Sequence, residues 1–318
     1  MEVVALGTSA GAPTRERNVQ ACYVRLEDGS FVVFDCGEGT QHRLLEAGAK
    51  ARGPRRFRAG RVAAVCVTHL HGDHAFGLPG LLCYLDANGG AGAGPVELTG
   101  FPAAAPGARG EACEAPAAAV AGALAGVVCC DEVARAAAAA VDGTWHNIIT
   151  IPGATLRAAA LDHGAIPCVG YRLEERPRPG VVDAAAVAAA RRRWLEPAVF
   201  GALGRAALAG LPSVALADGA QGEAPAPLAV ALRGADVVLH EATLDDLAAL
   251  AHDRGHSTPG DAGRLAAAAR AATLALWHFS PRYKPGDLAA FADAARAHFG
   301  GTVVIASDLL AIPVARRT

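Results

Sequence analysis

Short apolar runs alternate with alanine-rich stretches along the chain. The apolar runs, which end at Gly, Pro or a polar residue, cover residues 2–6, 30–37, 61–69, 95–100, 155–163, 212–218, 235–243, 273–279 and 302–308. Such runs, bounded by turn-forming residues, predict buried strands. Alanine-rich stretches such as 134–143 and 264–272 predict helices, because alanine has the highest helix propensity. Strands interleaved with helices predict a layered α/β fold.

The segment 176–212 departs from this pattern. It is rich in Pro, Arg and Gly and contains only one or two short helical pieces. A chain of 318 residues is long enough for one large domain or two small ones. Since no repeat of fixed period is present, we predict a single domain over 1–318, with 176–212 as an inserted arm.

The longest apolar stretch does not predict a membrane helix. It covers 117–130, whereas a membrane span needs roughly 20 apolar residues. The opening residues, MEVVALG, have a strand pattern and lack the features of a secretory signal or a transit segment. We therefore expect no membrane partner and a cytoplasmic protein. The nucleus or an organelle stays open if a presequence has been removed.

The eight cysteines form no C-x-x-C pair. Cys36, Cys66 and Cys83 stand in apolar surroundings, which is typical of reduced thiols in a core. Reduced intracellular thiols are therefore favoured over a disulfide framework.

The charge is nearly balanced overall but uneven along the chain. A net charge of −2 argues against indiscriminate binding to nucleic acid. Residues 50–61 nevertheless carry six basic residues and no acid, and a second basic segment spans 175–194. Such runs are usually solvated surfaces. Beside a metal site they would instead suit a phosphate-rich polymer.

Residues of metal-binding type follow several of the predicted strands. The run 61–67 leads into a dense cluster made of His69, His71, Asp73 and His74. Later strands end in His163, in Asp218, in the pair His240 and Glu241, and in His278. Because α/β folds place their sites where strand ends meet, we expect these side chains to converge on one rim.

The number of candidate ligands indicates two metal ions. One zinc ion takes three or four ligands, and seven are available: His69, His71, Asp73, His74, His163, Asp218 and His278. Paired ions suit the cleavage of a phosphodiester, and ligation dominated by imidazole favours zinc over magnesium.

Other interpretations exist for individual residues. A lone His163 or His278 at a strand end is often a satisfied buried group, and Asp218 fits an ordinary turn. The dense spacing of 69–74 disfavours a coincidental polar loop. The remaining histidines fall in helix or loop patterns without ligand spacing: His42, His146, His252 and His298.

Two further positions bear on this cluster. Asp35 follows a strand, and we expect it to accept a hydrogen bond from a ligand histidine. His256 precedes a predicted helix start, with Thr258 as N-cap, Pro259 at N1 and Asp261 at N3. This cap would anchor the backbone next to His256.

Several motifs resemble those of the tRNase Z family in the metallo-β-lactamase superfamily, and they follow one another in the same order along the chain. THLHGDH (68–74), followed by GLPGLL, resembles the family's metal-binding motif. LGTSAGAPTRERN (6–18) resembles its opening loop, with Arg15 where lysine is usual. The remaining motifs are FDCGEGTQ (34–41), HGAIPCVGYR (163–172), HEAT (240–243), HST (256–258) and HFSPRYKP (278–285). The resemblance spans nearly the whole chain and implies an αββα sandwich of two mixed sheets flanked by helices.

The resemblance also implies a division of the ligands between two Zn²⁺ ions, with Mn²⁺ or Mg²⁺ as substitutes. One ion would be held by His69, His71 and His163. The other would be held by Asp73, His74 and His278. Asp218 would bridge the two, although Ala217 stands before it where the family usually has glycine. Trp277 likewise stands where threonine commonly precedes the last ligand.

The implied activity is an endoribonuclease that removes the 3′ trailer of precursor tRNA. The products are a 3′-hydroxyl on the tRNA and a 5′-phosphate on the trailer. Asp73 would orient the attacking hydroxide as a base. His256 and Glu241 would act at the leaving oxygen, with His240 in support, because an alkoxide is a poor leaving group without a proton donor.

The resemblance further implies a homodimer and a set of tRNA-binding residues, which are Arg15, Arg17, Asn18, Arg176, Arg178, Arg191, Arg192 and Arg193. The arm 176–212 stands where the family carries a tRNA-gripping segment, but it is short, so we predict a reduced exosite. Two alternatives stay open. The short arm favours a phosphodiesterase for small or single-stranded substrates. A catalytically silent RNA-binding relative is disfavoured by the intact ligand set.

Overall fold

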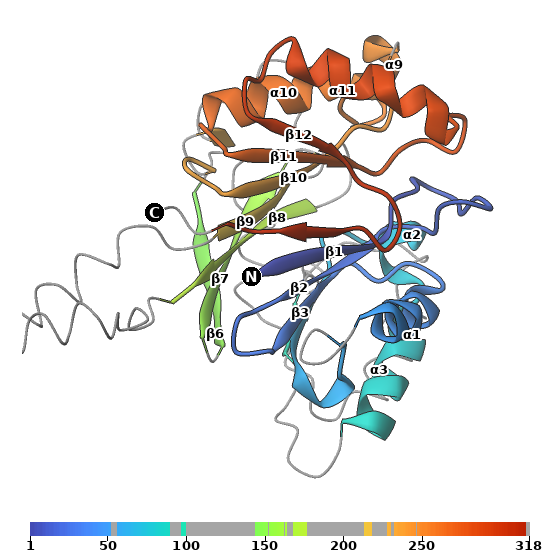
Figure 1. The fold of residues 1–318 in the computed structure, drawn as a ribbon, viewed down its shortest axis with the longest axis vertical. Coiled ribbons are helices and arrows are strands. Elements are labelled where there is room, and N and C mark those ends of the chain that lie inside the picture. Colours follow the sequence, from blue (N-terminus) through green and yellow to red (C-terminus); the bar gives the residue numbers. More distant parts are fainter. Residues whose placement is uncertain are drawn as a thin grey trace, which may run out of the picture.

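Two β-sheets form the centre of the molecule, and helices cover the outer side of each sheet (Figure 1). The structure is a computed structural model. It describes residues 1–51, 56–89, 97–99, 144–151, 153–161, 163, 168–176, 213–217, 228–229, 232–245 and 247–315. The side chains of 97–99 and of residue 217 are not included in this description.

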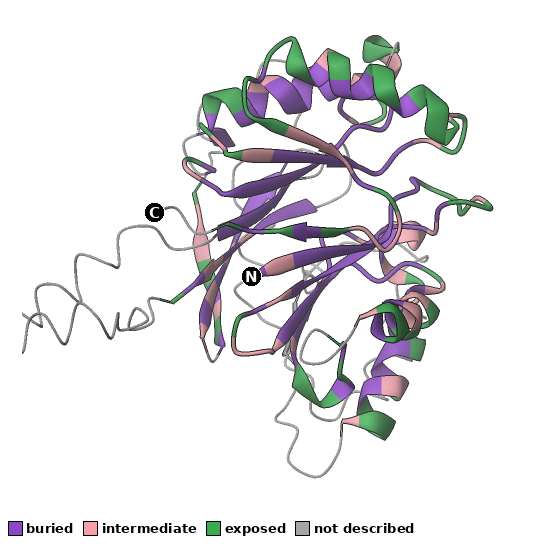
Figure 2. Cartoon of the chain, viewed as in Figure 1, coloured by how far each residue is buried: buried purple, intermediate pink, exposed green. Residues whose placement is uncertain are grey.

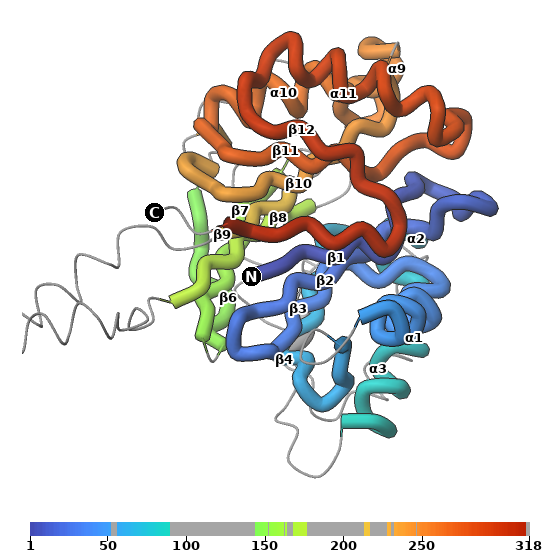
Figure 3. The backbone as a smooth tube through the Cα atoms, viewed as in Figure 1, coloured from blue at the N-terminus to red at the C-terminus, as the bar shows by residue number. Residues whose placement is uncertain are grey.

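The first sheet has six strands in the order β13-β1-β2-β3-β4-β5. Their bounds are Ala311–Pro313, Glu2–Gly7, Ala21–Arg25, Phe31–Phe34, Val62–Cys66 and Glu97–Thr99. Neighbouring strands are antiparallel from β13 to β3, and the β3–β4 and β4–β5 pairs are parallel. The last strand pairs with the first, so the two ends of the chain lie side by side (Figure 3).

The second sheet has seven strands in the order β12-β11-β10-β9-β8-β7-β6. Their bounds are Thr302–Ile305, Thr273–Trp277, Val237–Glu241, Ser213–Ala217, Cys168–Glu175, Ala154–Leu161 and His146–Ile151. The strands from β9 to β12 are parallel, and those from β6 to β9 are antiparallel. β10 and β11 are buried along almost their whole length because parallel strands are covered on both faces.

Three hydrophobic clusters show how the layers are held together. One joins the facing sides of the two sheets and includes Phe34, Tyr171 and Leu239. A second joins the outer side of the seven-stranded sheet to the helices α10 (Pro259–Ala268) and α11 (Leu288–Arg296). A third joins the six-stranded sheet to the helices α1 (Thr40–Lys50) and α3 (Leu78–Asn88).

Burial follows these layers: the strands are mostly buried, and the helices expose their outer faces (Figure 2). Two short helices, α2 (Gly72–Ala75) and α9 (Ala248–Asp253), lie in connections rather than in the layers. Helix, sheet, sheet and helix follow one another, which confirms the predicted αββα sandwich.

Each of the apolar runs named above contains a strand, but four strands were not predicted. These are β2, β6, β8 and β13. β6 and β8 each carry three polar residues and expose part of one face, so no continuous apolar run marks them. His146, expected in a helix or loop, lies in β6.

Cys83 was wrongly expected in a core. It lies on the exposed face of α3, because the buried face of this helix is formed by Leu78, Leu81, Leu82 and Leu85. Cys36 and Cys66 lie in the core as expected, and Cys22 and Cys168 are buried as well.

Several sequence predictions concern residues that the structure does not describe. They include the alanine-rich stretch 134–143, the apolar stretch 117–130 and the arm from 177 to 212. Within the described residues, no helix is long and apolar enough to cross a membrane.

Gly263 on α10 offers a test of the packing between the two outer helices. A Cβ at this position would lie 2.5 Å from the backbone oxygen of Ala295 on α11. Gly263→Ala should therefore destabilise the protein by about 1–3 kcal/mol, although alanine is the better helix former. The measurement is urea unfolding.

Gly260→Ala on the same helix is the matched control. A Cβ there would come no closer than 3.5 Å to the flexible end of Arg264. This variant should be neutral or slightly stabilising. Equal effects of the two substitutions would show that helix propensity, and not packing against α11, decides the result.

Candidate metal centre

The ends of β4, β7, β10 and β11 bring ligand-type side chains together, as the sequence predicted. Residues 68–74 follow β4, His163 follows β7, and His278 follows β11. The centre therefore takes residues from both sheets. A pocket of about 440 Å³ opens over it, lined by His71, Asp73, His278 and their neighbours.

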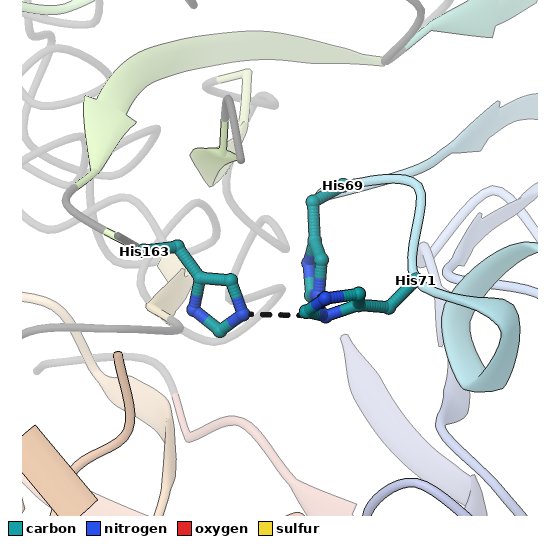
Figure 4. Close-up of side chains that lie close together, drawn as sticks. All are labelled: His69, His71 and His163. Atoms are coloured by element: carbon teal, nitrogen blue, oxygen red, sulfur yellow. Dashed lines mark hydrogen bonds between the residues drawn. The ribbon is translucent and has the colours of Figure 1, made fainter. Parts of the chain in front are cut away.

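His69, His71 and His163 form the first group of potential ligands. His71 Nδ1 lies 2.8 Å from His69 Nε2 and 3.4 Å from His163 Nε2. Figure 4 shows His163 reaching across from its own segment towards the two histidines that follow β4. Three ring nitrogens from two chain segments thus point to a common position.

Asp73, His74 and His278 form the second group. His74 Nε2 lies 3.1 Å from His278 Nε2, and Asp73 Oδ2 lies 3.3 Å from His278 Nε2 and 3.5 Å from His74 Nε2. All the potential ligand atoms of this group lie within 4.8 Å of one another. The same limit holds for the first group.

The hydrogen bonds of Nδ1 in His74 and His278 determine whether Nε2 of the same ring carries a proton. His74 Nδ1 donates to Asp35 Oδ2 at 2.9 Å. His278 Nδ1 donates to Thr243 Oγ1 at 2.9 Å, because that hydroxyl itself donates to Glu241. Both neutral rings therefore carry a lone pair on Nε2, and the two lone pairs face each other with the Asp73 carboxylate beside them. Only a cation makes this arrangement favourable, so these residues fit a bound metal ion.

Asp35 is the predicted hydrogen-bond acceptor behind the ligands, and the structure confirms this. Its carboxylate also accepts hydrogen bonds from the backbone N–H and the hydroxyl of Thr68. Thr68 Oγ1 in turn accepts from His69 Nδ1 at 3.0 Å. One buried carboxylate therefore orients one histidine in each group, directly for His74 and through Thr68 for His69.

Burial favours the neutral form of the three histidines in the first group. It lowers the pKa of His69 and His71, and it lowers the pKa of His163 to about 4. Although burial acts to raise the pKa of Asp73, its close contacts with His278 and His74 and the N–H of Gly11 outweigh burial and hold that pKa below its usual value. Neutral imidazoles and an ionised carboxylate are the forms that bind metal ions.

Glu241 and His256 form a pair beside the two groups. His256 Nδ1 lies 2.9 Å from Glu241 Oε2, and His163, Glu241 and His256 offer atoms within 4.8 Å of one another. Burial acts to raise the pKa of Glu241, but the hydrogen bond from His256 and the nearby ring of His278 hold it well below its usual value. An ionised Glu241 thus orients His256, whose ring lines the pocket.

The helix start behind His256 has the predicted geometry. Thr258 caps α10 by accepting from the backbone N–H of Asp261, and the Asp261 carboxylate accepts from the backbone N–H of Thr258. The same carboxylate accepts a hydrogen bond from His252, a residue to which the sequence assigned no role. These contacts fix the backbone two residues after His256.

The loop 6–18 reaches the centre through its backbone. The N–H of Gly11 donates to Asp73 Oδ2 at 2.6 Å. Arg17, which the resemblance placed among the tRNA-binding residues, is buried, and its guanidinium donates to the carbonyls of Ser280 and Tyr283. Asn18 donates through its side chain to the carbonyl of Glu38, whereas Arg15 is exposed.

The remaining predicted residues lie away from these groups or outside the described residues. His240 is fully buried in β10, where Nδ1 donates to the carbonyl of Glu241 and burial lowers its pKa. Arg176 is exposed after β8. The residues outside the description are Asp218, Arg178, Arg191, Arg192 and Arg193.

Thr68 and Thr243 are the supporting residues that the sequence reasoning missed. Each lies within a quoted motif, in THLHGDH and in HEAT. The available signal was that Thr68 directly precedes His69 and that Thr243 follows Glu241 by two residues. A threonine at a strand end is too common to indicate a role before its partners are known.

Comparisons with known proteins identify the family of the chain. Residues 15–97 match the model of the metallo-beta-lactamase superfamily. The chain is 41% identical to the ribonuclease Z of Kineococcus radiotolerans, over 99% of this chain and 96% of that protein. It is 34% identical to the ribonuclease BN of Citrobacter koseri, over 89% of this chain and 90% of that protein. The chain belongs to the ribonuclease Z family.

A solved structure supports the same assignment. The crystal structure of human tRNase Z, short form, superimposes with a TM-score of 0.65 and 25% identity, over 99% of this chain and 100% of that one. A diphosphatase of the PhnP family has the same fold, with a TM-score of 0.57 and 16% identity. The ribonuclease Z assignment therefore rests on sequence identity as well as on the fold.

Asp35→Asn should weaken zinc binding about 10- to 100-fold, because the amide no longer provides an ionised acceptor for His74 Nδ1. The measurement is competition with a chromophoric zinc chelator. Asp293→Asn is the control, since Asp293 is exposed on α11 and should leave the affinity unchanged. Equal affinities for the two variants would contradict the role of Asp35.

The low pKa of His163 predicts a pH dependence of stability in chelator-treated protein. In the folded state His163 stays neutral down to about pH 4. In the unfolded chain a histidine binds its proton near pH 6.5. Between these values the unfolded state binds more protons, so the free energy of unfolding should fall as the pH drops from about 6.5 towards 4.

Urea unfolding at several pH values in the presence of a chelator measures this slope. His163→Gln should have a shallower slope than the unaltered protein. The difference should be at most about 1.4 kcal/mol per pH unit, the value for one proton. Identical slopes would show that His163 titrates normally.

Proposed function

We propose that this ribonuclease Z family member is the metal-dependent endonuclease that removes the 3′ trailer of precursor tRNA. The products would be a 3′-hydroxyl on the tRNA and a 5′-phosphate on the trailer. The observation that carries the proposal is the placement of two groups of potential metal ligands beside the Glu241–His256 pair. The full-length similarity to proteins named ribonuclease Z supports this choice of substrate.

We propose two Zn²⁺ ions, with Mn²⁺ or Mg²⁺ as substitutes. His69, His71 and His163 would hold one, and Asp73, His74 and His278 the other. Asp218, outside the described residues, would bridge them. When bound, the pair supplies positive charge that activates water and stabilises the negative charge developing on the phosphate.

The Glu241–His256 pair would manage the proton needed by the leaving group. Cleavage that leaves a 3′-hydroxyl requires a proton on the departing 3′ oxygen. With Nδ1 donating to Glu241, His256 presents Nε2 to the pocket. The carboxylate of Glu241 would stabilise the protonated imidazole and keep Nε2 aimed at the leaving oxygen. His240 would contribute only through the backbone of Glu241.

Asp73 would combine ligation with orientation of the nucleophile. One of its oxygens, Oδ2, lies next to both ligand histidines and accepts from the N–H of Gly11. This hydrogen bond fixes the carboxylate, so that it can accept a hydrogen bond from the attacking water in a single orientation.

Binding of the tRNA body would be separate from this chemistry. Arginine forms two parallel hydrogen bonds with a phosphate, and Arg15 and Arg176 are exposed as such contacts require. The arm arginines and Asn18 remain proposed contacts, and the buried Arg17 would act by bracing the loop. The homodimer and the cytoplasmic location also stay predictions.

The test is cleavage of a 3′-extended precursor tRNA, with mapping of the chemical ends of both products. A 3′-hydroxyl on the tRNA and a 5′-phosphate on the trailer are the expected result. Efficient hydrolysis of bis(p-nitrophenyl) phosphate without cleavage of the precursor would instead favour the phosphodiesterase alternative. A purified protein with well under one zinc ion per chain would favour the silent relative.

Asp73→Ala should reduce cleavage by at least about a thousandfold and change the affinity for precursor tRNA only slightly. The reason is that phosphate contacts carry most of the affinity, whereas Asp73 acts on the reacting atoms. Single-turnover cleavage and a filter-binding assay measure the two quantities. A large loss of RNA affinity, with the fold intact, would contradict this division of roles.

A further inference from the structure

Phe76 is exposed in a place where an exposed phenylalanine is unusual. Its exposed fraction is 71%, the highest among the large apolar side chains that the structure describes. Single apolar residues on a convex surface need no explanation. Phe76, however, lines the pocket over the metal centre. A large apolar group kept in water beside a reactive site suggests a ligand that covers it.

The phenyl ring packs against backbone that is anchored by hydrogen bonds. Phe76 follows α2 directly, and its backbone N–H donates to the carbonyl of Gly72 at 3.0 Å. A Cβ on Gly72 would lie 2.4 Å from a ring carbon, so the ring packs on the bare backbone of that glycine. The next residue, Gly77, donates to the carbonyl of Cys36 at 2.8 Å. The chain is therefore tied down on both sides of the ring.

The pocket has two chemically different sides. His71, Asp73 and His278 provide the polar side, where the proposed metal ions would bind the phosphate group. Pro13, Val19 and Phe76 provide apolar groups in the same pocket. A ligand that fills both sides has a phosphate next to a flat apolar group, and a nucleotide has this composition.

We propose that Phe76 is the stacking platform for a nucleobase that flanks the scissile phosphate. This inference rests on the proposed function, because cleavage within RNA places one base on each side of the phosphate. Stacking of bases on aromatic rings is strong and tolerates all four bases. The platform would hold one neighbouring nucleotide so that its phosphate stays at the metal centre, without selecting its sequence.

The test combines variants of Phe76 with abasic substrates. Precursor tRNA is prepared with a normal nucleotide, or an abasic one, immediately 5′ or immediately 3′ of the scissile phosphate. Phe76→Ala should lower kcat/KM for the normal precursor about tenfold or more, and Phe76→Trp should retain most of it. Leu45→Ala, which removes another exposed apolar side chain outside the pocket, should have no effect.

The abasic substrates identify the stacked base. When the abasic nucleotide replaces the stacked base, cleavage by the unaltered enzyme should fall about as much as Phe76→Ala lowers it on the normal precursor. Combining Phe76→Ala with this abasic substrate should add little to that loss. At the other position the two losses should multiply. Circular dichroism and zinc content confirm that the variants are folded and loaded.

Four results would overturn the inference. Phe76→Ala could cleave as fast as the unaltered enzyme, or its loss could multiply with the abasic loss at both positions. A change in molecular mass of Phe76→Ala would show that a second copy covers the ring instead. A loaded, unaltered enzyme that cuts no precursor tRNA would contradict the proposed function itself, and with it the nucleobase as the occupant.

Discussion

The facing lone pairs of His74 and His278 are the constraint on which the rest of the site depends. Their Nε2 atoms lie 3.1 Å apart because Asp35 and Thr243 take the protons of the opposite ring nitrogens. Without a cation between them, two such acceptors beside the carboxylate of Asp73 repel one another. The folding free energy must therefore hold these groups together before a metal ion binds, and metal binding offsets the repulsion between them.

Two residues of the centre have unusual backbone conformations. Asp35 and His278 are not glycines, yet both have a positive φ, of 56°. Such conformations persist only where the surroundings determine them strongly. Asp35 is fixed by its bonds with Thr68 and His74, and His278 is fixed by the hydrogen bond from its Nδ1 to Thr243. Two of the four non-glycine residues with positive φ in the described chain therefore belong to the centre: one orients a ligand, and the other is a potential ligand.

The two sheets contribute different parts of the chemistry, and their packing brings those parts together. The six-stranded sheet supplies the ligands that follow β4, and the seven-stranded sheet supplies His163, Glu241 and His278. The apolar cluster between the sheets fixes the distance across the centre. Close approach of the backbone also matters, since a Cβ on Gly37 would lie 2.2 Å from the carbonyl oxygen of Asp73. Core packing thus sets the geometry of a polar site.

The sequence by itself determined the layered fold, the strands with continuous apolar runs and the identity of the candidate ligands. These are local properties, since a buried strand must be apolar and histidines or carboxylates must stand where metal ions bind. It did not reveal β6 and β8, whose half-exposed faces interrupt the apolar pattern. Only the tertiary structure decided that Arg17 is buried, that Thr68 and Thr243 set the protonation of the ligands, and that Phe76 is exposed in the pocket. The reason is physical: protonation and exposure depend on partners that lie far away along the chain and meet only when the two sheets pack.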